Sequence, residues 1–192
     1  MQSNQPMKEF VMNLLKSKLP LSYHYHEPAH TLYVQDKTIE IATQENCTPK
    51  EIALLSVAAL WHDTGFINIY KGHEEESCKL AMQYLPGYGY SADDIQTICG
   101  MIMATKLPQS PKNKLEEIIA DADLEYLGAK DADIMAEKLF SELQSLNPAL
   151  TREKWNRQQI SFIKNHHYFT RFCREYRESV KSAYLKKLQD KV

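Results

Sequence analysis

The sequence predicts an all-α protein, a single-domain helical bundle. Two observations support this prediction: strand signals are scarce, and helical signals recur along the chain. The 192 residues contain no Asn-Gly or Asp-Gly hairpin turn and no sustained alternation of apolar and polar residues, the pattern of a half-buried strand. Apolar residues recur instead at the three- and four-residue spacing of amphipathic helices.

The composition argues against several classes of protein, among them nucleic-acid-binding, membrane-spanning and secreted proteins. The 23 basic and 25 acidic residues nearly balance, so a nucleic-acid partner and a polybasic membrane patch are not expected. The longest apolar run, Ile52–Trp61, is too short to span a bilayer, and Met1–Met7 lacks the apolar segment of a signal peptide. The four cysteines form no Cys-x-x-Cys pair, which argues against a thiolate zinc site. We expect a soluble, cytoplasmic protein of one domain, residues 1–192; its oligomeric state is left open.

Two helices are predicted near the N-terminus. The first covers Met7–Leu19 and ends at Pro20. The second begins at Pro28, which suits a first helical turn, and runs to about Glu45. The segment that joins them and opens the second helix contains three histidines, His24, His26 and His30. His30 therefore lies in the first turn of the second helix.

The most apolar helix is predicted from Pro49 to about Asp63. Thr48 is its N-cap, and Pro49 occupies the first helical position. A helix that is apolar on almost all sides lies at the centre of a fold, yet this one ends in His62 and Asp63. Gly65 permits the helix to stop through a left-handed cap.

The rest of the chain continues the alternation of helices and short connections. The connections are marked by Gly, Pro and Asn, and the helices by their apolar spacing. The predicted elements are a loop over Phe66–Gly72, a helix from His73 to Leu85, a turn over Pro86–Tyr90, a helix capped at Ser91 and containing Met103, a loop over Leu107–Asn113, and helices over Leu115–Leu124, Asp131–Leu146 and Arg152–Leu188, the last with a break near Thr170.

Four side chains qualify as ligands of one divalent metal. A carboxylate at the end of an apolar helix is costly to bury unless it is paired or metal-bound. Helical bundles bring side chains from separate helices to one point, and imidazole with carboxylate suits Zn, Mn, Fe or Mg. Between Asp121 and Asp123, we take Asp121 as the inward residue because it shares a helix side with Ile118. The predicted ligands are His30, His62, Asp63 and Asp121. The plainer alternative is that Asp63 caps the helix or faces solvent, with His62 in the core.

This ordered set resembles the HD superfamily of metal-dependent phosphohydrolases, and more closely a group of small stand-alone bacterial HD-domain proteins. The resemblance runs from about Tyr25 to Gly128 and continues more weakly through Trp155 and Asn165-His166. It implies an all-helical HD core over about residues 22–130, with C-terminal helices over 131–192. The stretches that carry it are Tyr25-His26-x-x-x-His30-Thr31, His62-Asp63-Thr64-Gly65-Phe66, His73-Glu74, Met103-Ala104-Thr105 and Asp121-Ala122-Asp123-Leu124-x-Tyr126-Leu127-Gly128.

The resemblance also implies a function. The four ligands would hold a divalent ion (Mn, Fe, Zn, Co, Ni or Mg), and the protein would hydrolyse a phosphoester or phosphoanhydride bond. The expected substrate is a nucleotide or a related small phosphorylated metabolite. Branches acting on nucleoside monophosphates or guanosine tetraphosphate carry an acid a few residues after the His-Asp pair, and Thr64–Asn68 has none. Only His73 lies where two-metal branches carry extra histidines, so a full second site is not expected, although His26 or Glu74 is available to complete one.

Four residues are candidates for catalysis: Asp63, His73, Glu74 and Lys106. Asp63 would serve as ligand and general base, or Glu74 would be the base. His73 and Glu74 would position water or substrate, whereas the plainer reading of Glu74 is an acid that complements the helix dipole. Lys106, with Lys71, would supply cations for phosphoryl oxygens, unless both are ordinary surface lysines.

Two other classes of protein compete with the enzyme. One is a non-catalytic module that uses the HD scaffold to sense a metal or nucleotide, or to bind a partner. Such modules tend to lose a ligand, and the full ligand set favours the enzyme. The other is a helical protein with scattered core histidines, which leaves the His62-Asp63 ending of the most apolar helix unexplained.

Overall fold

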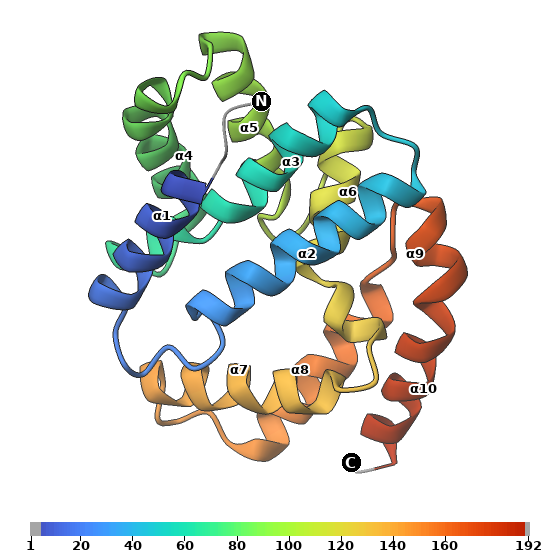
Figure 1. The fold of residues 1–192 in the computed structure, drawn as a ribbon. Helices are drawn as coiled ribbons and strands as arrows, with labels where there is room; N and C mark the ends of the chain where they lie inside the picture. Colours follow the sequence, from blue (N-terminus) through green and yellow to red (C-terminus); the bar gives the residue numbers. More distant parts are fainter. Residues whose placement is uncertain (1–4, 191–192) are drawn as a thin grey trace.

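The computed structural model describes residues 5–190, and every regular element within them is helical (Figure 1). The predicted all-α class is confirmed. The elements are α1 (Gln5–Lys18), α2 (Pro28–Gln44), α3 (Pro49–Trp61), η1 (Thr64–Ile67), α4 (His73–Tyr84), η2 (Leu85–Tyr88), α5 (Ala92–Ala104), α6 (Lys114–Asp123), η3 (Glu125–Gly128), α7 (Ala132–Leu146), α8 (Arg152–Asn165), α9 (Arg171–Tyr176) and α10 (Glu178–Gln189), where η denotes a short 3₁₀ helix.

The helix α3 lies at the centre, as its composition predicts. Thr48 and Glu51 form a complete capping box at its start, which satisfies backbone N–H groups that a helix end leaves free. From Leu54 to Trp61, every residue except Ser56 is buried. The helix packs against α2, α5 and α6, so the residues that follow it emerge in the interior of the fold.

Gly65 has a role other than the predicted left-handed cap. The described glycines with positive φ are Gly72 and Gly89. A Cβ at Gly65 would instead lie 2.0 Å from the carbonyl oxygen of His73. The absence of a side chain therefore lets η1 touch the start of α4. Ser77 fastens this contact, because its Oγ donates to the carbonyl of His62 at 2.6 Å and accepts from the N–H of Gly65 at 2.8 Å.

Two predicted connections contain short helices. The predicted loop over Phe66–Gly72 begins inside η1, and the predicted turn over Pro86–Tyr90 begins inside η2. The long C-terminal segment divides into α8, α9 and α10, with the first break at residues 166–170. The predicted break near Thr170 is confirmed.

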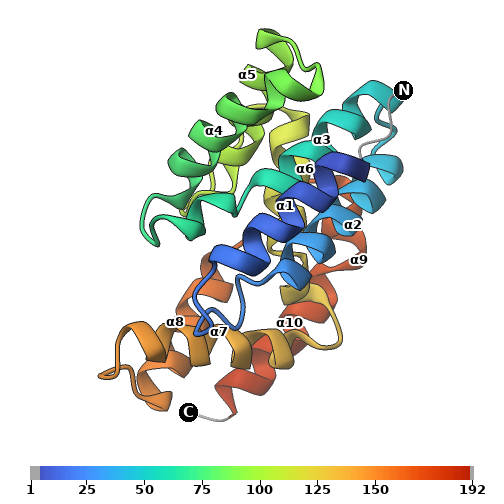
Figure 2. The ribbon, with the colours of Figure 1, turned by 60° about the vertical axis from the view of Figure 1, so that its left-hand side comes forward.

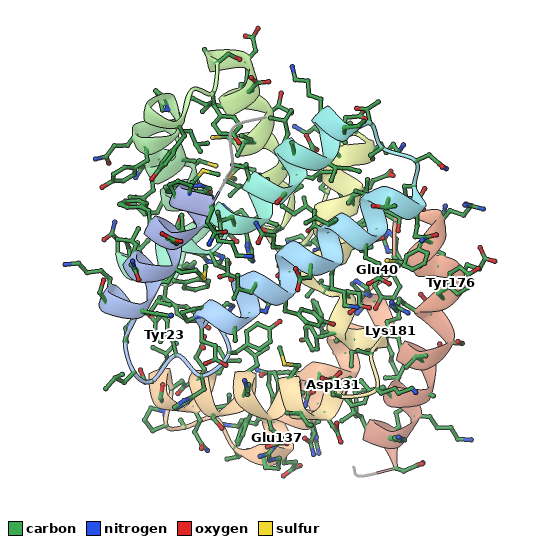
Figure 3. All side chains as sticks on the ribbon, in the orientation of Figure 1. Tyr23, Glu40, Asp131, Glu137, Tyr176 and Lys181 are labelled. Atoms are coloured by element: carbon green, nitrogen blue, oxygen red, sulfur yellow. The ribbon has the colours of Figure 1, made fainter. Side chains whose placement is uncertain are left out.

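The apolar side chains form two clusters. The larger one unites α1 to α6, and the smaller one lies between η3, α7, α8 and α10. Figure 2 shows α7, α8 and α10 gathered at one end of the molecule. Between α9 and α10, Arg177 Nη2 bonds to Glu40 Oε1 of α2 at 3.2 Å; Figure 3 labels Glu40 on α2 and Lys181 on α10. Within residues 5–190, no helix combines the length and apolarity needed to cross a membrane.

Candidate metal centre and adjoining cavity

Three helices deliver side chains to one buried point. His30 comes from the first turn of α2, His62 from the end of α3 and Asp123 from the end of α6, and one ligand atom of each lies within 4.8 Å of the others. Asp63 joins them, with Oδ2 3.1 Å from His62 Nε2 and 3.5 Å from His30 Nε2. Asp123 Oδ1 lies 3.4 Å from His30 Nε2 and 3.6 Å from His62 Nε2. We call these four residues the His-Asp cluster.

The hydrogen bonding of the His-Asp cluster fits a metal ion. Nδ1 of His62 donates to the carbonyl of Ala59 at 2.8 Å, so in the neutral ring Nε2 carries the lone pair that faces the cluster. Within the described residues, His62 Nε2, both ring nitrogens of His30 and Asp63 Oδ2 are buried and make no hydrogen bond of normal geometry, although His62 Nε2 and Asp63 Oδ2 lie only 3.1 Å apart. Buried polar atoms normally have partners. Two imidazoles and two carboxylates are a donor set that suits a divalent transition metal.

The charges within the His-Asp cluster shift the pKa values of its members. Burial lowers the pKa of His62, but Asp63 and Asp123 outweigh it and raise that pKa well above its usual range. Burial raises the pKa of Asp123, but the imidazoles of His30 and His62 prevail and lower it to about 2. The pKa of Asp63 is lowered in the same way by His62. Both carboxylates are therefore ionised at neutral pH, as metal ligands must be.

Asp121 does not face the His-Asp cluster, so its prediction as a metal ligand is wrong. Its Oδ1 accepts the N–H of Phe169 at 2.9 Å, while Oδ2 accepts the N–H and hydroxyl of Thr170 at 2.8 and 2.6 Å. Asp121 is fully buried, as its helix side predicts, but that side faces the segment leading into α9. Asp123, at the last position of α6, takes the place predicted for Asp121. The helical pattern distinguishes inward from outward positions and does not say which neighbour an inward residue meets.

His73 and Glu74 lie beside the His-Asp cluster. His73 Nδ1 donates to the carbonyl of Tyr70 at 3.1 Å, and its Nε2 lies 3.5 Å from Asp63 Oδ1. The ring stacks on Phe66, with centroids 3.7 Å apart. Glu74 is buried, and its Oε2 lies 3.6 Å from His73 Nδ1. The contact of η1 with α4 thus brings both predicted residues to the edge of the site.

Lys106 lies at the rim of the site and is paired. Its Nζ bonds to the carboxylate of Glu75, and both side chains are almost half exposed. Lys71 and Lys106 both line the cavity described below. Two cations therefore line the cavity that adjoins the His-Asp cluster, and one of them is partly neutralised by Glu75.

Glu142 is a component of the site that the sequence analysis missed. It comes from α7, is fully buried, and accepts from the backbone N–H groups of Tyr25 and His26 and from the hydroxyl of Tyr70. Nδ1 of His26 also donates to it. Burial raises the pKa of Glu142, but His26 outweighs it, and the net pKa lies below its usual value. The only sequence signal is a glutamate among the apolar residues of α7, between Leu139 and Leu143.

A cavity of about 640 Å³ adjoins the His-Asp cluster. Asp63, Asp123, His73 and Glu74 contribute polar lining, with Lys71 and Lys106. A different part of the lining comes from α7 and α8 and is mostly apolar: Leu139, Leu143, Trp155, Gln158, Gln159, Phe162 and Ile163. We call these seven residues the α8 wall. The volume is in the range of small-molecule sites.

Comparison with known proteins identifies the fold. No family model and no curated protein matches the sequence. A predicted HD superfamily hydrolase from an uncultured Thermotogales bacterium is similar in structure, with a TM-score of 0.65 over 99% of this chain and 97% of that chain at 18% identity. The chain has the HD-superfamily fold. Bacillus subtilis YpgQ, solved in complex with ADP, gives a TM-score of 0.66 at 18% identity, covering 98% of this chain and 94% of its own. The Lin1889 protein of Listeria innocua gives 0.61 at 15% identity, covering 98% and 96%.

The HD fold explains why residues far apart in sequence meet. The helix α2 packs along both α3 and α6, so the start of α2 and the ends of α3 and α6 converge. The predicted HD-type architecture is confirmed. The predicted ligands His30, His62 and Asp63 are brought together, and Asp123 joins them in place of Asp121.

Proposed function

We propose that this protein is a metal-dependent phosphohydrolase that cleaves a phosphoester or phosphoanhydride bond in a nucleotide or a related small phosphorylated metabolite. The observation that supports this most is the His-Asp cluster, in which unpartnered imidazole nitrogens and ionised carboxylates converge. His30, His62, Asp63 and Asp123 would hold the ion. A divalent metal in such a site lowers the pKa of bound water and polarises a phosphoryl oxygen.

The chain's own residues supply the remaining functions. His73 Nε2 or the carboxylate of Asp63 or Glu74 would accept the proton of a water molecule at the cluster. Supporting this, His73 Nε2 lies 3.5 Å from Asp63 Oδ1, and Glu74 Oε2 lies 3.6 Å from His73 Nδ1. A general base needs hydrogen-bond reach of that proton. Lys71 and Lys106 would bind the phosphoryl oxygens, whose charge must be stabilised during transfer. Glu142 would hold the Tyr25-His26 segment and Tyr70 in place around the site.

A nucleotide is the substrate class we favour. The cavity is large enough for one, and its lining combines cations and metal-binding groups with aromatic side chains. YpgQ, which shares the fold, was solved in complex with ADP. The non-catalytic alternative, a metal or nucleotide sensor on the same scaffold, gives no role to His73 and Glu74 beside the cluster.

The test starts from the metal. We would measure the metal content of the purified protein, remove the ion by chelation, and restore Mn, Fe, Zn, Co, Ni or Mg one at a time. Each form would be assayed with nucleoside mono-, di- and triphosphates and with small phosphomonoesters. We expect hydrolysis that disappears on chelation and returns with one or more ions. Metal-loaded protein that binds nucleotides but hydrolyses none of these compounds would identify a sensor instead.

Variants then separate catalysis from stability. In Glu74→Gln and His73→Ala we expect near-normal metal content and melting temperature, with turnover reduced about 100-fold or more, the usual scale of general acid–base catalysis. Glu76→Gln is the matched control, because Glu76 lies in the same helical turn but pairs with Lys79 and Asn68 outside the cavity. Unchanged turnover in both test variants would leave Asp63 as the base.

A further inference from the structure

The α8 wall is uncharged and mostly apolar, so it has no evident role in binding phosphate. The residues of α7 and α8 that line the cavity include no charged side chain. Trp155 and Phe162 supply aromatic surface, and Leu139, Leu143 and Ile163 supply aliphatic surface. Such a lining fits an uncharged, flat group and not a second phosphate or a charged headgroup.

One amide on this wall is held in a fixed orientation. Gln159 is buried, and its Oε1 accepts a hydrogen bond from the hydroxyl of Tyr184 at 3.1 Å. Burial raises the pKa of Tyr184 to about 12, so this hydroxyl remains a donor at neutral pH. Because the carbonyl end is engaged, the Nε2 end of the amide remains available as a donor at the cavity.

The aromatic surface and the oriented amide of the α8 wall favour one kind of uncharged ligand group over others. An acyl chain would satisfy the aliphatic side chains but would leave the Gln159 amide buried without an acceptor, which is unfavourable. A sugar would need several donors and acceptors, whereas the wall offers few. A nucleobase has a flat face for aromatic stacking and ring nitrogen or carbonyl acceptors at its edge.

We propose that the α8 wall binds the nucleobase of a nucleotide, with the ring packed against Trp155 and Phe162 and an acceptor on its edge hydrogen-bonded by Nε2 of Gln159. This inference rests on the proposed function for the position of the phosphates beside the His-Asp cluster. Tyr184 acts as a positioning residue, because it contacts Gln159 and does not line the cavity.

The experiment measures binding to metal-free protein in the presence of a chelator, so that no turnover is needed. The chain has two tryptophans; Trp61 is fully buried in the core, and Trp155 lines the cavity. ADP should quench the emission of Trp155, whereas inorganic pyrophosphate, which lacks a base, should not. Trp155→Phe should abolish the quench.

Variants of the amide test the hydrogen bond itself. By equilibrium dialysis, Gln159→Leu should weaken ADP binding about tenfold, the scale of one lost hydrogen bond in a buried site, with pyrophosphate binding unchanged. Tyr184→Phe should reduce the discrimination among ADP, GDP, CDP and UDP, because the amide is then free to turn. Gln96→Leu on the exposed side of α5 is the control and should bind as wild type.

The outcomes separate the two proposals. If ADP quenches Trp155 and Gln159→Leu weakens its binding while no phosphorylated compound is hydrolysed, the nucleobase site stands and the proposed function fails. If hydrolysis occurs but ADP leaves the Trp155 emission unchanged, or folded Gln159→Leu binds ADP like wild type, the nucleobase site is overturned and the proposed function stands.

Discussion

Glu142 Oε2 accepts a hydrogen bond from the backbone N–H of Tyr25 at 2.9 Å, across 117 residues of sequence. The same oxygen accepts the N–H of His26 at 3.0 Å. This bond joins α7 to the segment that leads into α2 and therefore to His30. A buried carboxylate thus connects the second apolar cluster to the end of the first where the His-Asp cluster lies.

Replacing Glu142 should lower stability more than any change on the exposed side of α7. Glu142→Ala would leave two backbone N–H groups and His26 without their acceptor, and unsatisfied buried donors cost about 1–3 kcal/mol each. We expect the free energy of unfolding in urea to fall by about 3 kcal/mol or more. The control is Glu137→Ala on the same helix, which removes an exposed pair with Arg152 and should change stability little. Equal effects in the two variants would contradict the role given to Glu142.

Lys106 should matter for substrate and not for stability. Its bond to Glu75 is largely solvent-exposed, and exposed ion pairs contribute little. Lys106→Met should leave the melting temperature unchanged but raise KM for the phosphorylated substrate severalfold, because a cation that contacts phosphoryl oxygens is lost. Lys79→Met, which breaks an exposed pair with Glu76 outside the cavity, is the control. Identical kinetics in both variants would make Lys106 an ordinary surface lysine.

His166 should make the protein less stable in mild acid. Burial and then Lys181 lower the pKa of His166 to about 3, below the value near 6.5 expected in the unfolded chain. The unfolded state therefore binds more protons between these two pH values, so stability falls as pH decreases through this window. One such group contributes a loss of about 1–2 kcal/mol between pH 7 and pH 5.

His166→Asn provides the comparison for this effect. The carbonyl of His166 accepts from Lys181 Nζ at 2.7 Å, and its Nδ1 lies 3.2 Å from the same atom; an asparagine oxygen can accept from it as well. The other charged groups around His166 are Glu178, which pairs with Lys181, and His167, which also acts to lower the pKa of His166. Urea unfolding at the two pH values should show a smaller loss for His166→Asn than for wild type. Parallel losses would assign the acid sensitivity to other groups.

The sequence allowed much of the fold to be predicted, because its signals are local. Proline starts, caps and apolar spacing located the helices to within a few residues, and the composition of α3 located the centre. Contacts between distant segments were not predictable in this way. Asp121 and Asp123 are both acids at the end of α6, and only packing against α9 and α2 assigns one to Thr170 and the other to the His-Asp cluster.

The roles of Gly65 and Glu142 also depend on contacts with segments that are distant in sequence. Glycine after a helix commonly marks a left-handed cap, but here it permits the approach of α4. A glutamate in a helix is usually solvent-exposed. Glu142 is buried instead, and backbone N–H groups of Tyr25 and His26, remote in sequence, donate hydrogen bonds to it. In both cases the deciding partner is remote in sequence.

The metal content of Asp123→Asn and Asp121→Asn, measured by elemental analysis of folded, purified protein, decides whether the His-Asp cluster binds the ion and which aspartate is the ligand. We predict about one ion per wild-type chain. Asp123→Asn should lose most of this metal, because it removes an ionised ligand. Asp121→Asn should keep the metal but melt at a lower temperature, since an amide cannot accept all the bonds from Phe169 and Thr170. If Asp121→Asn does not fold, Thr170→Val serves in its place. Full metal content in Asp123→Asn, together with loss of metal from folded Asp121→Asn, would show that Asp121 and not Asp123 is the ligand.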